Sequence, residues 1–185
     1  MGKIIIEPYL LALQENSVVI AWEVNQNSNY SLKYKEIGAK TYKTAKLQQL
    51  CIDNGNSNIL YFAQLIKLEI NNMYQYNIYE GKTIIHKNTF STAKNSEKLK
   101  ILTVGDTHSF ELHEDIQKSI EKHQPNFILH SGDISFATGD QREQYEKNWF
   151  KLISQSLQQF PVYYTPGNHD NGKYFDYYFI KPIQN

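Results

Sequence analysis

Residues 100–133 read KILTVGDTHSFELHEDIQKSIEKHQPNFILHSGD. The stretch contains two short apolar runs, KILTV and NFILH, and Gly-Asp follows each of them. Between the runs, Leu112, Ile116 and Ile120 recur at helical spacing, and Pro125 ends the pattern. Two strand-like runs around an amphipathic helix are typical of a β-α-β unit. The stretch therefore predicts two parallel strands joined by a helical crossover.

The same pattern continues downstream. The segment QREQYEKNWFKLISQSLQQF, residues 141–160, has aromatic and aliphatic residues at helical spacing and predicts one long amphipathic helix. The next segment, PVYYTPGNHD, residues 161–170, is a third strand-like run that ends in Gly-Asn-His-Asp. Residues 99–185 thus predict a β-α-β-α-β order and a parallel sheet with helical crossovers.

Residues 1–93 have the alternation of β-strands instead. In SVVIAWEV, residues 17–24, every second residue is large and apolar, and Glu23 lies on the opposite side. This alternation predicts a sheet with one face in a core and one face in water. Several such runs separated by turn residues predict an all-β sandwich over 1–93. The polar residues 94–98 predict a linker, so we expect two domains, 1–93 and 99–185.

Composition excludes several classes of function. The formal net charge is zero and Arg142 is the single arginine, so we expect no nucleic-acid partner. No apolar run approaches the roughly 18 residues of a membrane span, and the N-terminus lacks the pattern of a signal peptide. We therefore expect no membrane association, and the compartment stays open. The single cysteine, Cys51, excludes an internal disulfide and a multi-thiolate metal site.

Three polar motifs follow the three predicted parallel strands: GDTH, GDIS and GNHD. Because the carboxyl ends of parallel strands meet at one edge of a sheet, we expect their side chains to converge there. The donors delivered are Asp106, His108, Asp133, Asn168 and His169. Oxygen and imidazole donors without sulfur suit Fe, Mn, Zn or Mg ions. We expect Asn168 to bind metal, His169 to face the substrate, and Asp170 to orient the His169 imidazole.

The order D-x-H, GD, GNHD, each after a strand, resembles the calcineurin-like metallophosphoesterase superfamily. The preceding sandwich, together with GNHD followed by YFDYYFIKPIQN, is similar to the purple acid phosphatase branch. The sandwich itself resembles a fibronectin type III domain in two segments. SVVIAWEV carries the buried tryptophan, Trp22. LEINNMYQYNI fits the tyrosine corner, in which the Tyr74 hydroxyl bonds to the backbone upstream.

The resemblance implies a role for each site residue. Asp106 and His108 would bind a first metal ion, Asp133 would bridge two ions, and Asn168 would bind the second. His169 would stabilise the transferring phosphoryl group or protonate the leaving oxygen. The implied cofactors are two divalent or trivalent ions of Fe, Mn or Zn, and the implied reaction is hydrolysis of a phosphate ester by a metal-bound hydroxide.

The chain departs from the family pattern in two places. Purple acid phosphatases carry a tyrosine three residues after the bridging Asp, where this chain has Phe136, so we expect no tyrosinate charge-transfer band. The family also takes further histidine ligands from later motifs, and no histidine follows His169. We therefore expect residues 99–185 to be the N-terminal part of the phosphoesterase domain, with an incomplete metal site and impaired activity.

Other readings of the same residues remain open. The Asp, His and Asn residues could be ordinary turn and cap residues at strand ends. The chain could be a non-catalytic binding protein in which the sandwich does the binding and the phosphoesterase half is a remnant. A nuclease or nucleotide phosphodiesterase of the same superfamily is disfavoured by the scarcity of arginine. For His130, both a hydrogen bond behind Asp133 and no role at the site are open.

Overall fold

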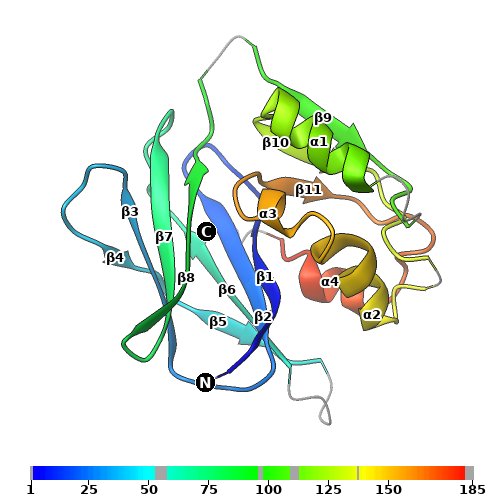
Figure 1. Ribbon diagram of the computed structural model, residues 1–185, viewed down its shortest axis with the longest axis horizontal. Helices are drawn as coiled ribbons and strands as arrows, with labels where there is room; N and C mark the ends of the chain where they lie inside the picture. The colour runs from blue at the N-terminus through cyan, green and yellow to red at the C-terminus, as the bar shows by residue number, and fades with distance from the viewer. Residues whose placement is uncertain (1, 53–57, 96–97, 109–112, 137, 182–185) are drawn as a thin grey trace.

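Figure 1 shows the computed structural model of the protein, which describes residues 2–52, 58–95, 98–108, 113–136 and 138–181. The described residues of the N-terminal half form eight β-strands and no helix: β1 (Ile4–Leu11), β2 (Val18–Val24), β3 (Tyr30–Glu36), β4 (Lys43–Thr44), β5 (Gln48–Leu50), β6 (Ile59–Leu65), β7 (Met73–Glu80) and β8 (Thr83–Ser91). Strands and helices then alternate: β9 (Ile101–Val104), α1 (His113–His123), β10 (Phe127–His130), α2 (Arg142–Tyr145), the π-helical turn η2 (Glu146–Phe150), α3 (Ser154–Leu157), β11 (Val162–Tyr164) and α4 (Lys173–Tyr178).

The N-terminal half is a sandwich of two antiparallel layers, as the alternation predicted. One layer has the order β4-β3-β7-β8, and β5-β6-β2-β1 form the other. The alternate β2 residues Val18, Ile20, Trp22 and Val24 are buried in the core between the layers. The Tyr74 hydroxyl accepts a hydrogen bond from the backbone N–H of Glu69 at 3.0 Å, so the predicted upstream bond is present.

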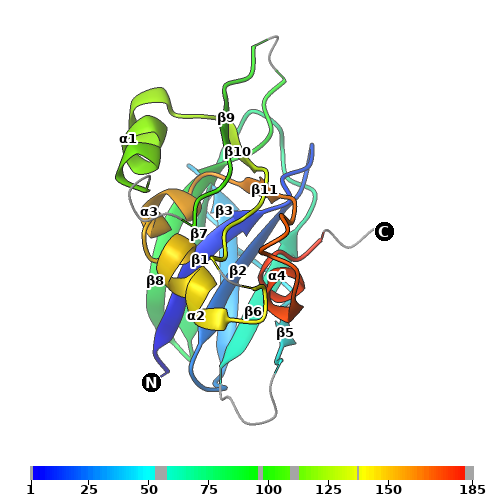
Figure 2. The same ribbon diagram turned by 90° about the vertical axis from the view of Figure 1, so that its right-hand side faces the viewer.

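The sandwich and the α/β half share one sheet. Strand β1 pairs in parallel with β11, with Leu11 opposite Val162, so a seven-stranded sheet runs in the order β5-β6-β2-β1-β11-β10-β9. Figures 1 and 2 show β1 running alongside both halves. The residues after the predicted linker therefore continue the sheet that the N-terminal strands begin.

Strands β9, β10 and β11 are parallel, and helical segments connect them, as the sequence predicted. Phe127 to His130 pair with Ile101 to Val104, and the next strand pairs from Val162 to Tyr164. Helix α1 buries Ile116 and Ile120, two residues of the predicted apolar stripe. The carboxyl ends of the three strands consequently lie side by side.

The single helix predicted over 141–160 is wrong, because the segment is broken into α2, η2 and α3. The N–H of Lys151 bonds to the carbonyl of Glu146, five residues earlier, at 3.0 Å. Such a bond inserts one residue into a turn and rotates the residues that follow. Leu152, one of the apolar residues at helical spacing in this segment, is 41% exposed, whereas Trp149 and Ile153 are fully buried.

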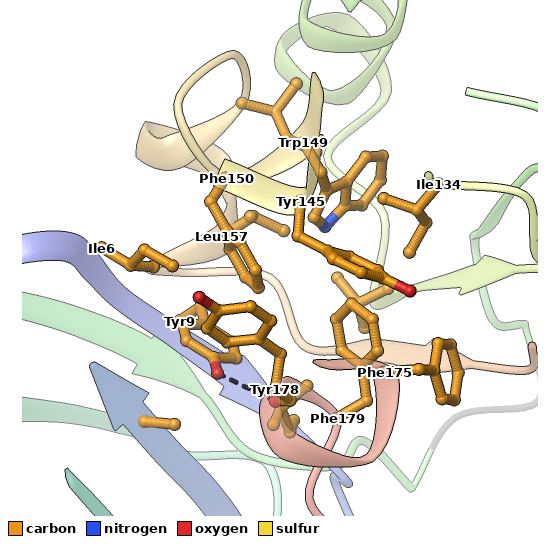
Figure 3. Packing of buried hydrophobic residues seen from close by; sticks show 14 of the residues in the cluster. Ile6, Tyr9, Ile134, Tyr145, Trp149, Phe150, Leu157, Phe175, Tyr178 and Phe179 are labelled. Atoms are coloured by element: carbon orange, nitrogen blue, oxygen red, sulfur yellow. Dashed lines mark hydrogen bonds between the residues drawn. The ribbon is translucent and has the colours of Figure 1, made fainter. Parts of the chain in front are cut away.

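A second core lies between the β1-β2-β6 face and the helical segments (Figure 3). Segments α3 and η2 contact β1, and the Tyr9 hydroxyl donates to the carbonyl of Tyr178 at 2.8 Å. The prediction of a solvated face on this sheet is therefore wrong. Val19 and Ala21 belong to this core, and Glu23 is fully buried.

Within the described residues, no helix is long and apolar enough to cross a membrane.

Candidate functional site

Each of the three predicted motifs lies directly after a parallel strand. Asp106 follows β9, Asp133 follows β10, and Asn168 follows β11. Asp106 and Asp133 both have left-handed backbones, with φ of 55° and 58°. Aspartate adopts this conformation more readily than most residues, yet it still costs free energy and is concentrated at functional sites. Both aspartates therefore lie in the segments that leave the carboxyl ends of β9 and β10.

Glycines bring the three loops into contact. A Cβ atom at Gly105 would overlap the hydroxyl of Ser131, and one at Gly132 would overlap the backbone nitrogen of Gly167. A Cβ at Gly167 would in turn overlap the carboxylate of Asp133. Backbone atoms of the neighbouring loop leave no room for a Cβ at Gly132 or Gly167, so these two glycines are required where the second and third loops meet. At Gly105 the overlap involves only a serine hydroxyl, which can rotate away.

We expect Gly132→Ala to lower the free energy of unfolding by at least about 2 kcal/mol, from backbone strain plus overpacking. Gly132 has φ of 104° and touches the third loop. Gly38→Ala is the matched control, because Gly38 has φ of 92° and open space around it. In the control, backbone strain alone should lower the free energy of unfolding, by about 1–2 kcal/mol. Equal urea midpoints for the two variants would show that the loop contact is unimportant.

Backbone hydrogen bonds fix the second loop against the other two. The N–H of Asp106 bonds to the carbonyl of Gly132 at 3.0 Å, and that of His108 bonds to the carbonyl of Asp133 at 3.2 Å. On the other side, the N–H of His169 bonds to the Asp133 carboxylate at 2.9 Å. Asp133 therefore lies between the first and third loops, and its bridging of two metal ions stays a prediction.

Asp106 and His108 form the closest pair of predicted metal ligands. Their Oδ1 and Nε2 atoms lie 3.2 Å apart. Two ligands of one ion, each about 2.0–2.2 Å from it, are roughly 3–3.5 Å apart, so this pair fits a shared cation. Nδ1 of His108 is buried and has no hydrogen-bond partner among the described residues.

The other predicted metal ligands do not join this pair in a compact group. Across the described ranges, no three His, Cys, Asp or Glu side chains gather closely enough to hold a metal ion. The structure thus brings together the loops and one ligand pair. The four-residue set of Asp106, His108, Asp133 and Asn168 stays a prediction.

Two rings, those of His169 and Phe136, lie beside His108. Its ring lies 5.5 Å from the His169 ring and 5.3 Å from the Phe136 ring, centre to centre. His169 is half-buried, Asn168 is exposed, and Phe136 is 63% exposed. The apolar ring of Phe136 therefore flanks the predicted ligand His108.

Asp170 has a structural role that the sequence did not reveal. Its carboxylate is fully buried and accepts the backbone N–H groups of Asp133 at 2.7 Å, Ser135 at 3.1 Å and Gly167 at 3.1 Å. The Tyr145 hydroxyl adds a bond at 3.3 Å. Burial, and then the charge of Asp170, raise the pKa of Tyr145, so its hydroxyl stays protonated and can donate. Asp170 thus ties the second loop to the third, and its predicted contact with the His169 imidazole stays a prediction.

Sequence reasoning missed Thr107 and left His130 open. Both side chains are fully buried, and the Thr107 hydroxyl lies 2.8 Å from Nε2 of His130. The Gly132 N–H, one residue before Asp133, donates to Nδ1 of His130 at 3.0 Å. The available signal was the position of Thr107 between two predicted ligands.

Comparison with known proteins agrees with this geometry over the second half of the chain. No curated protein gives a significant match. The family model described as calcineurin-like phosphoesterase matches residues 99–185, which contain all three motifs. Residues 99–185 therefore carry a calcineurin-like phosphoesterase domain, the superfamily that the order of the three motifs predicted.

Proposed function

We propose that this chain hydrolyses phosphate esters with the help of bound metal ions. The observation that carries the proposal is the packing of three glycine-led loops, each bearing a predicted ligand, at the carboxyl edge of a parallel sheet. The match to the calcineurin-like phosphoesterase family supports metal-dependent phosphoester hydrolysis in general.

In this proposal Asp106, His108, Asp133 and Asn168 hold two ions of Fe, Mn or Zn. When bound, the ions supply positive charge for the phosphate and acidify water. The shared fit of Asp106 and His108 to one cation supports the first part of the assignment. Asp133 is anchored to both flanking loops, which favours a bridging position.

His169 is the residue we assign to the leaving group. Its backbone is held by the Asp133 carboxylate, so the imidazole is placed beside His108 at the edge of the sheet. A half-buried imidazole at that point can donate a proton to the departing oxygen. The substrate would be a phosphate monoester or diester.

The proposal is tested by hydrolysis of a chromogenic phosphate monoester and a diester with Mn²⁺, Zn²⁺ or Fe³⁺. We expect His169→Ala to lower kcat by about 10²- to 10⁴-fold, the usual contribution of general acid catalysis. His123→Ala is the matched control, because His123 is exposed at the end of α1. It should leave kcat and metal affinity unchanged. Equal kcat values for His169→Ala and wild type would remove His169 from the mechanism.

Two finer assignments belong to the same proposal. We place the chain near the purple acid phosphatases, with Phe136 in place of their tyrosine, and we assign the sandwich to the fibronectin type III class. The strand arrangement β5-β6-β2-β1 against β4-β3-β7-β8 and the Tyr74 hydrogen bond support the second assignment.

The alternative is a non-catalytic protein in which the sandwich is the binding module. It is favoured by the observation that the described residues show no group of three acidic, histidine or cysteine ligands. A chain that neither binds Mn²⁺, Zn²⁺ or Fe³⁺ in calorimetry nor turns over either ester would support this alternative over the phosphoesterase.

A further inference from the structure

His130 has both ring nitrogens engaged, and each one reaches a different metal-site loop. Nδ1 accepts the N–H of Gly132 at 3.0 Å, in the second loop. Nε2 lies 2.8 Å from the Thr107 hydroxyl, in the first loop. Because Nδ1 is the acceptor, the ring proton of the neutral imidazole must be on Nε2, which then donates to Thr107. The bonding pattern thus fixes one tautomer.

The imidazole is held in place from the helical side. Its ring packs edge-on against Trp149 at 4.6 Å and stacks on Tyr164 at 5.8 Å, centre to centre. The Trp149 indole N–H donates to the Tyr164 hydroxyl at 2.7 Å. Since His130 and Thr107 are both fully buried, water cannot replace their hydrogen bond without opening the core.

The partners of His130 are immediate neighbours of predicted ligands. Thr107 lies between Asp106 and His108, and Gly132 precedes Asp133. Both Asp residues have left-handed backbones, which persist only where the surroundings hold them. A buried bridge between the two loops therefore fixes how far apart these carboxylates and the His108 imidazole can be.

We propose that His130 and Thr107 are positioning residues, which set the geometry of the first two metal-site loops through the Nε2–H to Oγ1 hydrogen bond. The inference rests on the proposed function, since it assigns the bridge a purpose in metal binding. Removing groups that orient metal ligands typically costs about 10- to 100-fold in metal affinity.

The decisive comparison is Thr107→Val against Thr107→Ser, by calorimetric titration with Mn²⁺. Valine keeps the shape and loses the hydroxyl, whereas serine keeps the hydroxyl. We expect Mn²⁺ affinity to fall about 10- to 100-fold in Thr107→Val and to stay near wild type in Thr107→Ser. Tyr74→Phe controls for a general loss of stability, because it removes a buried tyrosine hydroxyl from a backbone bond in the sandwich. It should leave Mn²⁺ affinity unchanged.

Two measurements on the metal-free protein keep the inference testable without metal binding. The ¹⁵N shifts of His130 in the wild type should report a neutral ring with the proton on Nε2. Hydrogen exchange at the Asp106 and Gly132 amides should be faster in Thr107→Val than in Thr107→Ser. A charged ring or the other tautomer, unchanged exchange, or Mn²⁺ affinity equal to wild type in Thr107→Val would overturn the proposal. A wild type that binds no metal would overturn the proposed function, and the ring shifts and amide exchange would still decide whether the bridge holds the loops.

Discussion

Replacing Arg142 with methionine is expected to lower the free energy of unfolding by about 3–5 kcal/mol, because it leaves a buried carboxylate without its cation. Arg142 Nη2 donates to Glu23 at 2.7 Å, and Nη1 donates to Glu146 at 2.7 Å. Glu23 is fully buried beneath the helical layer, and the hydroxyls of Tyr177 and Tyr178 also donate to it, at 3.4 Å. These two hydrogen bonds are long and come from neutral hydroxyls, so they cannot replace the charge of the arginine. Urea denaturation followed by circular dichroism measures the loss.

Lys151→Met is the matched control for Arg142→Met. Lys151 pairs with the same Glu146 at 2.6 Å, but its side chain is 59% exposed. Exposed pairs contribute about 0–1 kcal/mol, so this variant should be nearly as stable as wild type. The double variant Glu23→Leu with Arg142→Met should recover much of the lost stability, because no unpaired charge is left behind. Equal losses in the two methionine variants would show that burial of Glu23 does not matter.

The Arg142 effect should depend on pH. Burial raises the pKa of Glu23 above its ordinary value of 4.5, and Arg142 offsets part of that rise. A raised folded-state pKa contributes stability that is present below the unfolded pKa and lost as pH rises through the folded one. Without Arg142 the folded pKa rises further. The deficit of Arg142→Met relative to wild type should therefore be largest at neutral pH and shrink as pH falls toward 4.5.

This ion pair also shows where sequence reasoning stopped. Alternation placed Val18, Ile20, Trp22 and Val24 in one core, which the structure confirms. It placed Glu23 in water, because alternation identifies two faces of a strand but not what packs on each. The covering layer comes from residues more than a hundred positions later, including Arg142. The apolar residues that share the face of Glu23 were the only local signal.

The candidate site was also predictable from the sequence only in part. Gly-Asp or Gly-Asn after each apolar run predicted that loops would meet at one sheet edge, since strand polarity alone fixes that edge. The contacts between the loops depend on side chains that carry no local pattern. A threonine between two ligands and a histidine before Ser-Gly-Asp look like ordinary residues in sequence. Their hydrogen bond exists only because β9 and β10 pair in register.

The second large effect concerns Asp170. Asp170→Asn replaces one carboxylate oxygen with an NH₂ group that faces backbone N–H donors. Hydrogen bonds to a charged group are worth about 1.5–3 kcal/mol each, so losing about two of them should destabilise the protein by about 3–5 kcal/mol. The bonds run to Asp133, Ser135 and Gly167, so the second and third loops should also separate. We therefore expect Mn²⁺ binding to be lost at temperatures where the variant is still folded.

Asp176→Asn makes the same change of charge at an exposed position on α4 and should be neutral in both measurements. Urea denaturation and Mn²⁺ titration of the two variants separate two roles for Asp170. If Asp170 only orients the His169 imidazole, Asp170→Asn should lower turnover and leave the stability and metal affinity of the protein unchanged. If Asp170 ties the loops together, Asp170→Asn should lower both the stability of the protein and its metal binding. Wild-type stability in Asp170→Asn would contradict the loop-tying role, because a fully buried carboxylate that accepts several backbone N–H groups cannot be replaced without cost.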